Sequence, residues 1–111
     1  MNVLEFAKKY DFKVFTDEKV AEKREIKGCY IGDLLSLAMA KVEADNVWIT
    51  IQTNLNIVAV ASLADASCIL IANGFVPDEN TLEKAQEKEI VILNTNLSVY
   101  EAAKKLMECG I

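Results

Sequence analysis

The spacing of apolar and polar residues changes along the chain, and each change predicts a new helix or strand. Apolar residues recur at helical spacing over residues 3–10, and a short alternation over 12–15 predicts a strand directly after that helix. A second strand is predicted over 26–31, with Gly28 as a candidate bend. The highly charged stretch between the two strands, residues 17–27, is interpreted as a solvated connection.

The remainder of the chain contains apolar and β-branched runs that predict strands in the middle of a sheet. Three such strands are predicted, over residues 47–51, 68–72 and 90–93. Trp48 lies in the first of them and is interpreted as a core residue, with a stacking platform or a dimer anchor as the alternatives. Consecutive strands start about 20 residues apart, a spacing that fits crossovers between parallel strands.

Helix starts are predicted from polar residues that can accept hydrogen bonds from free backbone N–H groups. Asp33 is expected to cap a helix over residues 34–44, which are rich in helix formers. Two residue pairs have the spacing of a capping box and predict helices that end near 89 and 109: Asn80 with Glu83, and Ser98 with Glu101.

The apolar run over residues 57–61 permits two interpretations, because short apolar runs do not separate a helix from a strand. It forms a hairpin with the preceding strand through residues 53–56, or it forms a helix capped by Asn56. With the helix, the second half of the chain consists of three strand–helix units. That order predicts an α/β domain with a mainly parallel sheet and helices on its faces.

Length and composition indicate one globular domain over residues 1–111. Apolar residues make up 52% of the chain, and one proline and four glycines leave no segment typical of a linker. The formal net charge is −5 without a cluster of Lys and Arg, which argues against nucleic-acid and anionic membrane partners. No apolar run is long enough to span a bilayer and no secretory signal is recognisable, so we expect a cytoplasmic protein.

The residue types needed for most catalytic and metal sites are missing. There is no His, no phosphate-binding loop of the Gly-x-x-x-x-Gly-Lys-Ser/Thr type, and no nucleophile beside a base in the sequence. The cysteines are widely separated and are interpreted as small buried residues: Cys29, Cys68 and Cys109. We therefore expect a protein without enzymatic activity, cofactor or metal. An enzyme would need Asp33 paired in space with Lys27 or Lys41.

Candidate ligand contacts gather where the predicted parallel strands end. Ligands of open α/β sheets bind beyond the carboxyl ends of the strands, next to helix N-termini that favour anions. Neutral amide and hydroxyl groups dominate these ends, and the candidate residues are Gly32, Asp33, Gln52, Thr53, Asn54, Asn56, Asn73, Gly74, Asn94, Thr95 and Asn96. The alternative is that these residues only cap helices and form turns.

Three stretches resemble those of small stand-alone bacterial DRTGG-domain proteins, in the same order along essentially the whole chain. They are YIGDLLSLAM (residues 30–39), VWITIQTNLNIVAVASL (47–63) and ILIANGFVPDENTLEKAQEKEIVIL (69–93). The resemblance implies a three-layer α/β/α domain and favours the helix interpretation after residue 56. The same fold resembles the N-terminal domain of HPr kinase/phosphorylase, but the phosphate-binding loop of that kinase is not in this sequence.

The resemblance implies two alternative functions. DRTGG domains are found fused to CBS regulatory domains, which implies a non-catalytic module that senses a small polar or nucleotide-like ligand at the strand ends. Stand-alone forms resemble proteins encoded near iron-only hydrogenase and electron-transfer subunits, which implies a homodimeric interaction module or an accessory to such a complex. The Asp-Arg-Thr-Gly-Gly signature is not present as such, and its position falls near residues 52–56, which read Gln-Thr-Asn-Leu-Asn.

Overall fold

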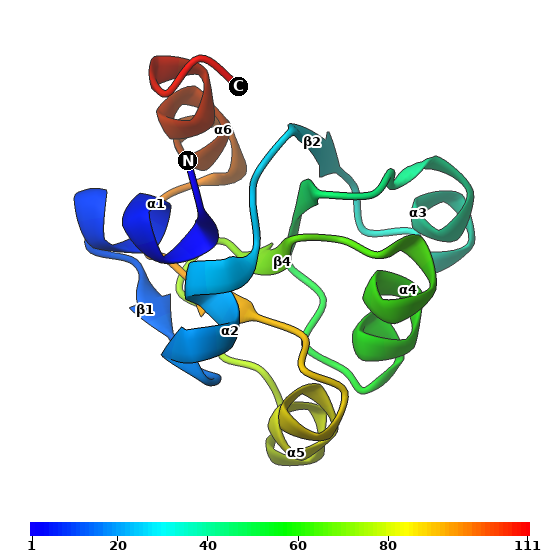
Figure 1. The fold of residues 1–111 in the computed structure, drawn as a ribbon. Coiled ribbons are helices and arrows are strands. Elements are labelled where there is room, and N and C mark those ends of the chain that lie inside the picture. Colours follow the sequence, from blue (N-terminus) through cyan, green and yellow to red (C-terminus); the bar gives the residue numbers. More distant parts are fainter.

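The computed structural model describes residues 1–111 and arranges them as a five-stranded sheet between helices (Figure 1). In chain order the elements are α1 (Val3–Lys9), β1 (Lys13–Val14), α2 (Glu18–Lys23), β2 (Gly28–Ile31), α3 (Leu35–Lys41), β3 (Asn46–Thr50), α4 (Asn56–Ala64), β4 (Cys68–Ile71), α5 (Glu79–Glu87), β5 (Ile92–Asn94) and α6 (Val99–Glu108). None of these helices has the length and apolar character that crossing a membrane requires.

The strand order across the sheet is β1–β5–β4–β3–β2. The strands β2, β3, β4 and β5 run parallel, and β1 pairs with β5 in the antiparallel direction. The helices α3, α4 and α5 each connect one parallel strand to the next. The sheet is therefore mainly parallel, as predicted, and the amino-terminal segment forms its antiparallel edge.

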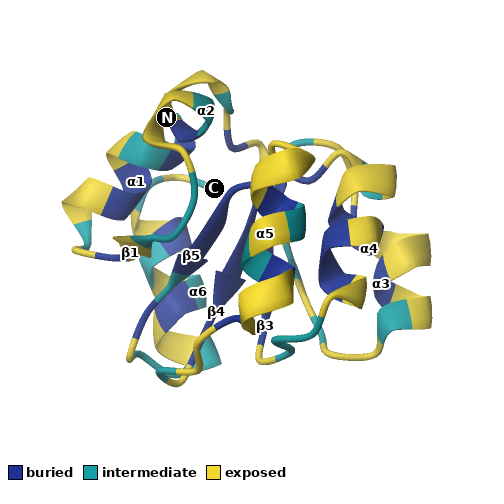
Figure 2. Ribbon diagram, turned by 90° about the horizontal axis from the view of Figure 1, so that it is seen from below, coloured by how far each residue is buried: buried dark blue, intermediate teal, exposed yellow.

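Neighbouring residues of each strand face opposite sides of the sheet, and this alternation builds two separate apolar cores. In β4, Cys68 and Leu70 pack in the core with α1, α2 and α6, whereas Ile69 and Ile71 pack in the core with α3, α4 and α5. All four side chains are fully buried. Figure 2 shows the buried strands between two groups of helices whose exposed faces turn outward. The predicted three-layer α/β/α architecture is confirmed.

Trp48 and the cysteines differ in how far the structure buries them. Trp48 is fully buried, and its indole Nε1 donates a hydrogen bond to the Gly32 carbonyl at 2.9 Å. Its interpretation as a core residue is therefore correct. Among the cysteines, Cys68 is buried, Cys109 is partly buried and Cys29 is exposed. The prediction of buried cysteines is correct only for Cys68.

Residues 57–61 form a helix and not a strand of a hairpin. They lie in α4, and β3 pairs with β4 in the parallel direction, so the chain crosses over between the two strands. The prediction that Asn56 caps this helix is wrong, because Leu55 holds the cap position. The side chain of Asn54 accepts the free backbone N–H of Asn56 at 2.9 Å, which moves the capping role two residues earlier.

The interpretation of residues 17–27 as a solvated connection is wrong, because six of these residues form α2. The Asp17 side chain caps this helix by accepting the Lys19 N–H at 2.8 Å. Ala21 is the only buried residue of α2 and packs in the core beside α1 and α6. One buried residue in a short helix gives too little apolar periodicity to recognise, so tertiary packing stabilises this helix.

For the helices α6 and α3, the structure confirms one predicted cap and corrects the other. The Ser98–Glu101 capping box starts α6 as predicted. The helix α3 begins after Leu34 and ends at Lys41, so the prediction that Asp33 caps a helix over 34–44 is wrong. The carboxylate of Asp33 accepts hydrogen bonds from the end of β3 and is not available to α3.

The helix α5 begins two residues earlier than its predicted capping box places it. Its cap position is Asp78, which places Asn80 inside the helix, so the prediction of a box between Asn80 and Glu83 is wrong. The Thr81 hydroxyl and the Asp78 N–H both donate to the Thr53 carbonyl, at 2.8 and 3.0 Å. Contact with the segment after β3 therefore sets the start of α5, and local capping does not.

Candidate functional site

The predicted ligand contacts lie beyond the carboxyl ends of the parallel strands, and the structure divides them into two groups. Residues near the ends of β2 and β3 are held by hydrogen bonds within the protein, and this group comprises Gly32, Asp33, Gln52, Thr53, Asn54 and Asn56. The segments after β4 and β5 border an open depression, and this group comprises Asn73, Gly74, Asn94, Thr95 and Asn96.

Asp33 connects the two strand ends of the first group. Its Oδ1 accepts hydrogen bonds from the Thr50 hydroxyl at 2.8 Å and from the Ile51 N–H at 3.0 Å. Its carbonyl accepts a hydrogen bond from Gln52 Nε2 at 2.9 Å. The carboxylate therefore ties the segment after β2 to the end of β3.

Gln52 and Asn54 extend this network toward α4. Asn54 Nδ2 donates to Gln52 Oε1 at 2.8 Å, and Asn54 Oδ1 accepts the Asn56 N–H. None of the four cavities of the molecule is lined by these residues. The arrangement is typical of amide and carboxylate side chains that form turns and satisfy helix N-termini.

The chain changes from one face of the sheet to the other between β4 and β5. The segment after β4 leads to α5, which packs on one face through Ala85, and the segment after β5 leads to α6, which packs on the other face through Leu106. Figure 1 shows α5 and α6 on opposite sides of the sheet. Such a switch between neighbouring strands opens a crevice at their carboxyl ends, and ligands of open α/β sheets bind there.

Backbone hydrogen bonds hold the two diverging segments in place. The Asn73 N–H donates to the Leu97 carbonyl and the Gly74 N–H donates to the Thr95 carbonyl, both at 2.8 Å. Asn73 and Gly74 both have positive φ angles, 60° and 74°. A Cβ on Gly74 would lie 2.8 Å from Asn96 Oδ1, so the left-handed backbone and the close approach both favour glycine.

A depression of about 740 Å³ opens at this switch between the faces. Four of the predicted residues line it: Gly74, Asn94, Thr95 and Asn96. The amino-terminal segment and α6 also contribute side chains, which include Lys9, Tyr10, Asp11, Lys13 and Lys105. The sequence-based prediction did not contain these five residues.

The amino-terminal segment reaches the depression because β1 is antiparallel. Lys13 lies opposite Asn94 in the register of the two strands, so β1 begins where β5 ends. The turn before β1 therefore carries Lys9 and Asp11 to the same edge of the sheet. Pairing between segments so far apart in the chain leaves no local signal, and only the alternation over 12–15 indicates that a strand exists there.

Positive charge exceeds negative charge in the lining of the depression, although the whole chain has a formal net charge of −5. The charged lining residues are Lys9, Lys13 and Lys105 with Asp11. Lys105 lies 3.9 Å from Glu108, which is one helical turn away. Lys9 and Lys13 form no ion pair. Two ammonium groups are thus left without a carboxylate partner.

The Tyr10 ring lies between two of these ammonium groups. Lys9 Nζ and Lys105 Nζ are 5.6 and 5.4 Å from the ring centroid, within the range of cation–π contacts. The Tyr10 hydroxyl contacts Cys109 Sγ at 3.3 Å and Glu108 Oε2 at 3.4 Å. The hydrogen bond to Cys109, desolvation and the Glu108 charge raise the pKa of Tyr10 to about 12, so its hydroxyl is neutral at physiological pH.

The chemistry available in the depression is that of binding. The Asn96 side chain has no hydrogen-bond partner in the protein, and Asn94 uses only its Nδ2, which donates to the Phe75 carbonyl at 3.1 Å. Amide and ammonium groups can bind a polar, negatively charged ligand. No group of three or more His, Cys, Asp or Glu residues could hold a metal ion. The enzyme alternative needs Asp33 paired with Lys27 or Lys41, but Lys27 forms its ion pair with Asp45, at 3.5 Å.

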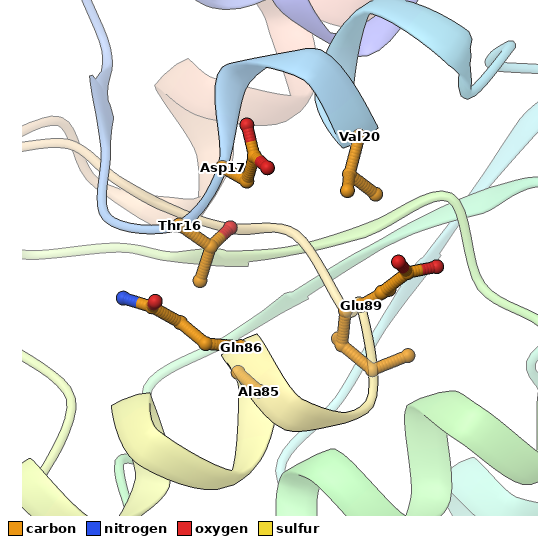
Figure 3. Close-up of a pocket in the computed structure, with 7 residues that line it drawn as sticks. Thr16, Asp17, Val20, Ala85, Gln86 and Glu89 are labelled. Carbon is orange, nitrogen blue, oxygen red and sulfur yellow. The ribbon is translucent and has the colours of Figure 1, made fainter.

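A smaller cavity lies at the amino end of β5, between α2 and the end of α5 (Figure 3). Thr16, Asp17, Gln86 and Glu89 are polar residues of its lining, and its volume is about 110 Å³. Thr16 Oγ1 accepts the Ile92 N–H at the start of β5, and Asp17 caps α2. Ligand pockets typically have volumes of roughly 300–1,000 Å³, so this cavity is too small for a metabolite.

Comparison with known proteins identifies a family and a structural relative. The DRTGG domain family model matches residues 5–109. The structure is similar to the CBS and DRTGG domains of the regulatory region of Clostridium perfringens pyrophosphatase, complexed with its activator diadenosine tetraphosphate, with a TM-score of 0.74 and 11% sequence identity. The similarity covers 93% of this chain and 44% of that one, and none of the curated proteins matches. The family match spans nearly the whole sequence, and this chain belongs to the DRTGG domain family.

Proposed function

We propose that this DRTGG domain is a non-catalytic regulatory module that binds a small polar, nucleotide-like ligand at the carboxyl ends of β4 and β5. One observation carries the proposal: a polar depression of about 740 Å³ opens where the chain changes faces of the sheet. The similarity to a regulatory region that is complexed with diadenosine tetraphosphate supports a nucleotide-like ligand.

The depression joins three segments that a ligand would hold together. Asn94 ends β5 and Asn96 follows it, Gly74 follows β4, and Lys9 belongs to the end of α1. The backbone bonds of Asn73 and Gly74 already fix the first two segments, so the ligand meets a preformed surface there. A ligand that also contacts α1 and α6 stabilises the packing of these helices.

Thermal unfolding against a panel of nucleotides and phosphorylated metabolites tests this proposal. A ligand at about 100 times its Kd adds roughly 2.7 kcal/mol to the free energy of unfolding. For a domain of this size, that gain corresponds to a rise in Tm of roughly 10 °C or more. If no compound of the panel raises the Tm, the sensing function is wrong.

Two asparagine variants locate the ligand. Asn96→Ala removes an amide that lines the depression and has no partner in the protein, so we expect an unchanged Tm without ligand and a smaller ligand-induced shift. Asn80→Ala is the matched control, because Asn80 is an exposed asparagine of α5 outside the depression. Equal shifts in both variants would place the ligand elsewhere.

The edge strand β2 favours a second candidate function, that of an interaction module. Only one side of β2 is paired, and apolar side chains are exposed beside this free edge: Ile31, Leu34 and Leu37 are 48%, 65% and 47% exposed. Unpaired strand edges and exposed apolar side chains are typical of surfaces that associate. In this function the domain forms a homodimer or serves as an accessory to a hydrogenase or electron-transfer complex.

Sedimentation velocity distinguishes the homodimer from the monomer. We expect Ile31→Lys to shift a dimer to the monomer, because a charge on each copy would be buried at the interface, whereas Lys41→Glu on the same side of the molecule serves as an exposed control. A wild-type protein that sediments as a monomer at all concentrations would refute the homodimer.

A further inference from the structure

We propose that Lys9, Lys13 and Lys105 bind the phosphate groups of the ligand, so that the depression selects phosphorylated molecules over uncharged ones. This inference rests on the proposed function and names the chemical class of its ligand. It concerns three lysines from three elements, α1, β1 and α6, that the fold brings to one depression.

The distribution of charge is the first reason. The chain contains 17 acidic and 12 basic residues, so an average surface patch is negative. In the depression, three lysines face one acidic residue, Asp11. With Glu108 counted, which lies 3.9 Å from Lys105, the local charge is still positive and attracts anions.

The second reason is that these ammonium groups lack carboxylate partners. Lys9 and Lys13 form no ion pair, and the pair of Lys105 with Glu108 is long, at 3.9 Å, and formed along one helix in solvent. Aromatic rings are their close neighbours instead: Lys9 and Lys105 lie at Tyr10, on the face of α1 and α6, and Lys13 Nζ lies 4.5 Å from the Phe15 ring centroid, on the face of α5. Ammonium groups held on aromatic rings keep their N–H donors available to an anion.

The third reason is the neighbourhood of amide donors. Lys13 lies opposite Asn94 in the strand register, and Asn96 belongs to the same lining with its side-chain amide unpartnered. Phosphate oxygens are strong acceptors that bind both ammonium and amide N–H groups. An uncharged nucleoside could use the amides but would gain nothing from the lysines.

The test is a titration of the ¹⁵N-labelled full chain, followed by NMR, with inorganic tripolyphosphate, with sulfate and with adenosine. We expect tripolyphosphate to shift the amide signals of Gly74, Asn96 and Lys13, and to bind more tightly than sulfate. Raising the salt concentration should weaken this binding, because screening shortens the range of the lysine charges.

Two triple variants with the same net charge separate a local site from overall charge. The site variant carries Lys9→Gln, Lys13→Gln and Lys105→Gln. The control variant replaces three exposed lysines that lie outside the depression and form no ion pair: Lys19→Gln, Lys41→Gln and Lys88→Gln. We expect the site variant to bind tripolyphosphate at least about tenfold more weakly and the control to bind within about twofold of wild type.

Each outcome decides between the two proposals. Tripolyphosphate binding that is equal in the site variant and wild type, or equally weakened in both triple variants, overturns the lysine site and leaves the proposed function standing. Binding of adenosine without binding of tripolyphosphate has the same meaning. Failure of all probes and of the nucleotide panel overturns both proposals. If the site variant does not fold by circular dichroism, the single variants Lys9→Gln and Lys13→Gln decide by the same criterion, with about threefold weaker binding expected for each.

Discussion

Substitution of Asp33 by Ala tests whether the polar residues after β2 and β3 hold the fold or contact a ligand. Asp33 Oδ1 is the acceptor for the Thr50 hydroxyl at 2.8 Å and for the Ile51 N–H at 3.0 Å. Thr50 is fully buried, so its hydroxyl loses its acceptor in Asp33→Ala without gaining water. Ile51 is partly accessible, so its N–H can bind water instead.

The expected loss in the free energy of unfolding is about 2–3 kcal/mol. A hydrogen bond to a charged group contributes about 1.5–3 kcal/mol to the free energy of unfolding. The loss of the Thr50 bond costs this full amount because its hydroxyl is buried, and the loss of the Ile51 bond costs little because water replaces Asp33. For a domain of this length that loss lowers the Tm by roughly 10 °C or more. Asp33→Asn retains the accepting oxygen without its charge and should lose about half as much, because charge-assisted bonds are roughly twice as strong as neutral ones.

Urea unfolding followed by tryptophan fluorescence measures these losses, since Trp48 is the single tryptophan and is fully buried. With an m-value of about 1.5 kcal/mol per M, the midpoint of Asp33→Ala should fall by about 1.3–2 M urea. A double-mutant cycle with Thr50→Val isolates the bond between the two side chains. We expect the double variant to lose about 1–2 kcal/mol less than the sum of the single variants.

Two results would refute this reasoning. A coupling energy of zero between Asp33 and Thr50 would show that the bond does not stabilise the fold. The second result concerns the ligand: a compound that raises the Tm of the wild type should raise the Tm of Asp33→Ala by the same amount. If that rise disappears while the variant unfolds at the wild-type urea concentration, Asp33 contacts the ligand and the network after β3 belongs to the binding site.

Three further predictions concern other parts of the structure. Gly74→Ala strains a φ of 74° and places its Cβ 2.8 Å from Asn96 Oδ1, so urea unfolding should show a loss of about 1–2 kcal/mol, and an unchanged midpoint would contradict the strain. Burial raises the pKa of the Cys68 thiol from 9.0 to about 12. Between pH 9 and 12 the unfolded chain therefore releases a proton that the folded chain keeps. The free energy of unfolding should fall over this pH range more steeply in the wild type than in Cys68→Ala. Arg24→Gln removes hydrogen bonds to the carboxylate of Asp65 at 3.0 Å and to the carbonyl of Asp65 at 2.9 Å. Since that carboxylate is mostly exposed, we expect the free energy of unfolding to fall by only about 1 kcal/mol, and by less at high salt. A loss that does not depend on salt would refute the ionic contribution.

The fold was predictable where the sequence carries local signals. The apolar runs that contain Trp48 and Leu70 are strands because both of their faces are buried, and the Ser98–Glu101 spacing is a complete signal for the start of α6. Prediction from local sequence fails where contacts between residues far apart in the chain determine where a helix forms. The start of α5 depends on the Thr53 carbonyl, and α2 depends on burying Ala21, and neither contact leaves a pattern in the neighbouring residues.

The candidate site divides for a similar reason, which lies in the topology of the sheet. The segments after β2 and β3 both lead to helices on the same face, so they run side by side and Asp33 and Gln52 bind one another. The segments after β4 and β5 lead to opposite faces, so they diverge and leave Asn96 facing open space. The sequence does not separate the two groups of polar residues, because it does not show which face of the sheet each following helix covers. That face is set by the connection to the helix and not by the amphipathic pattern of the helix. The placement of α6 on the face opposite to α5 therefore separates the network of turns after β2 and β3 from the depression after β4 and β5.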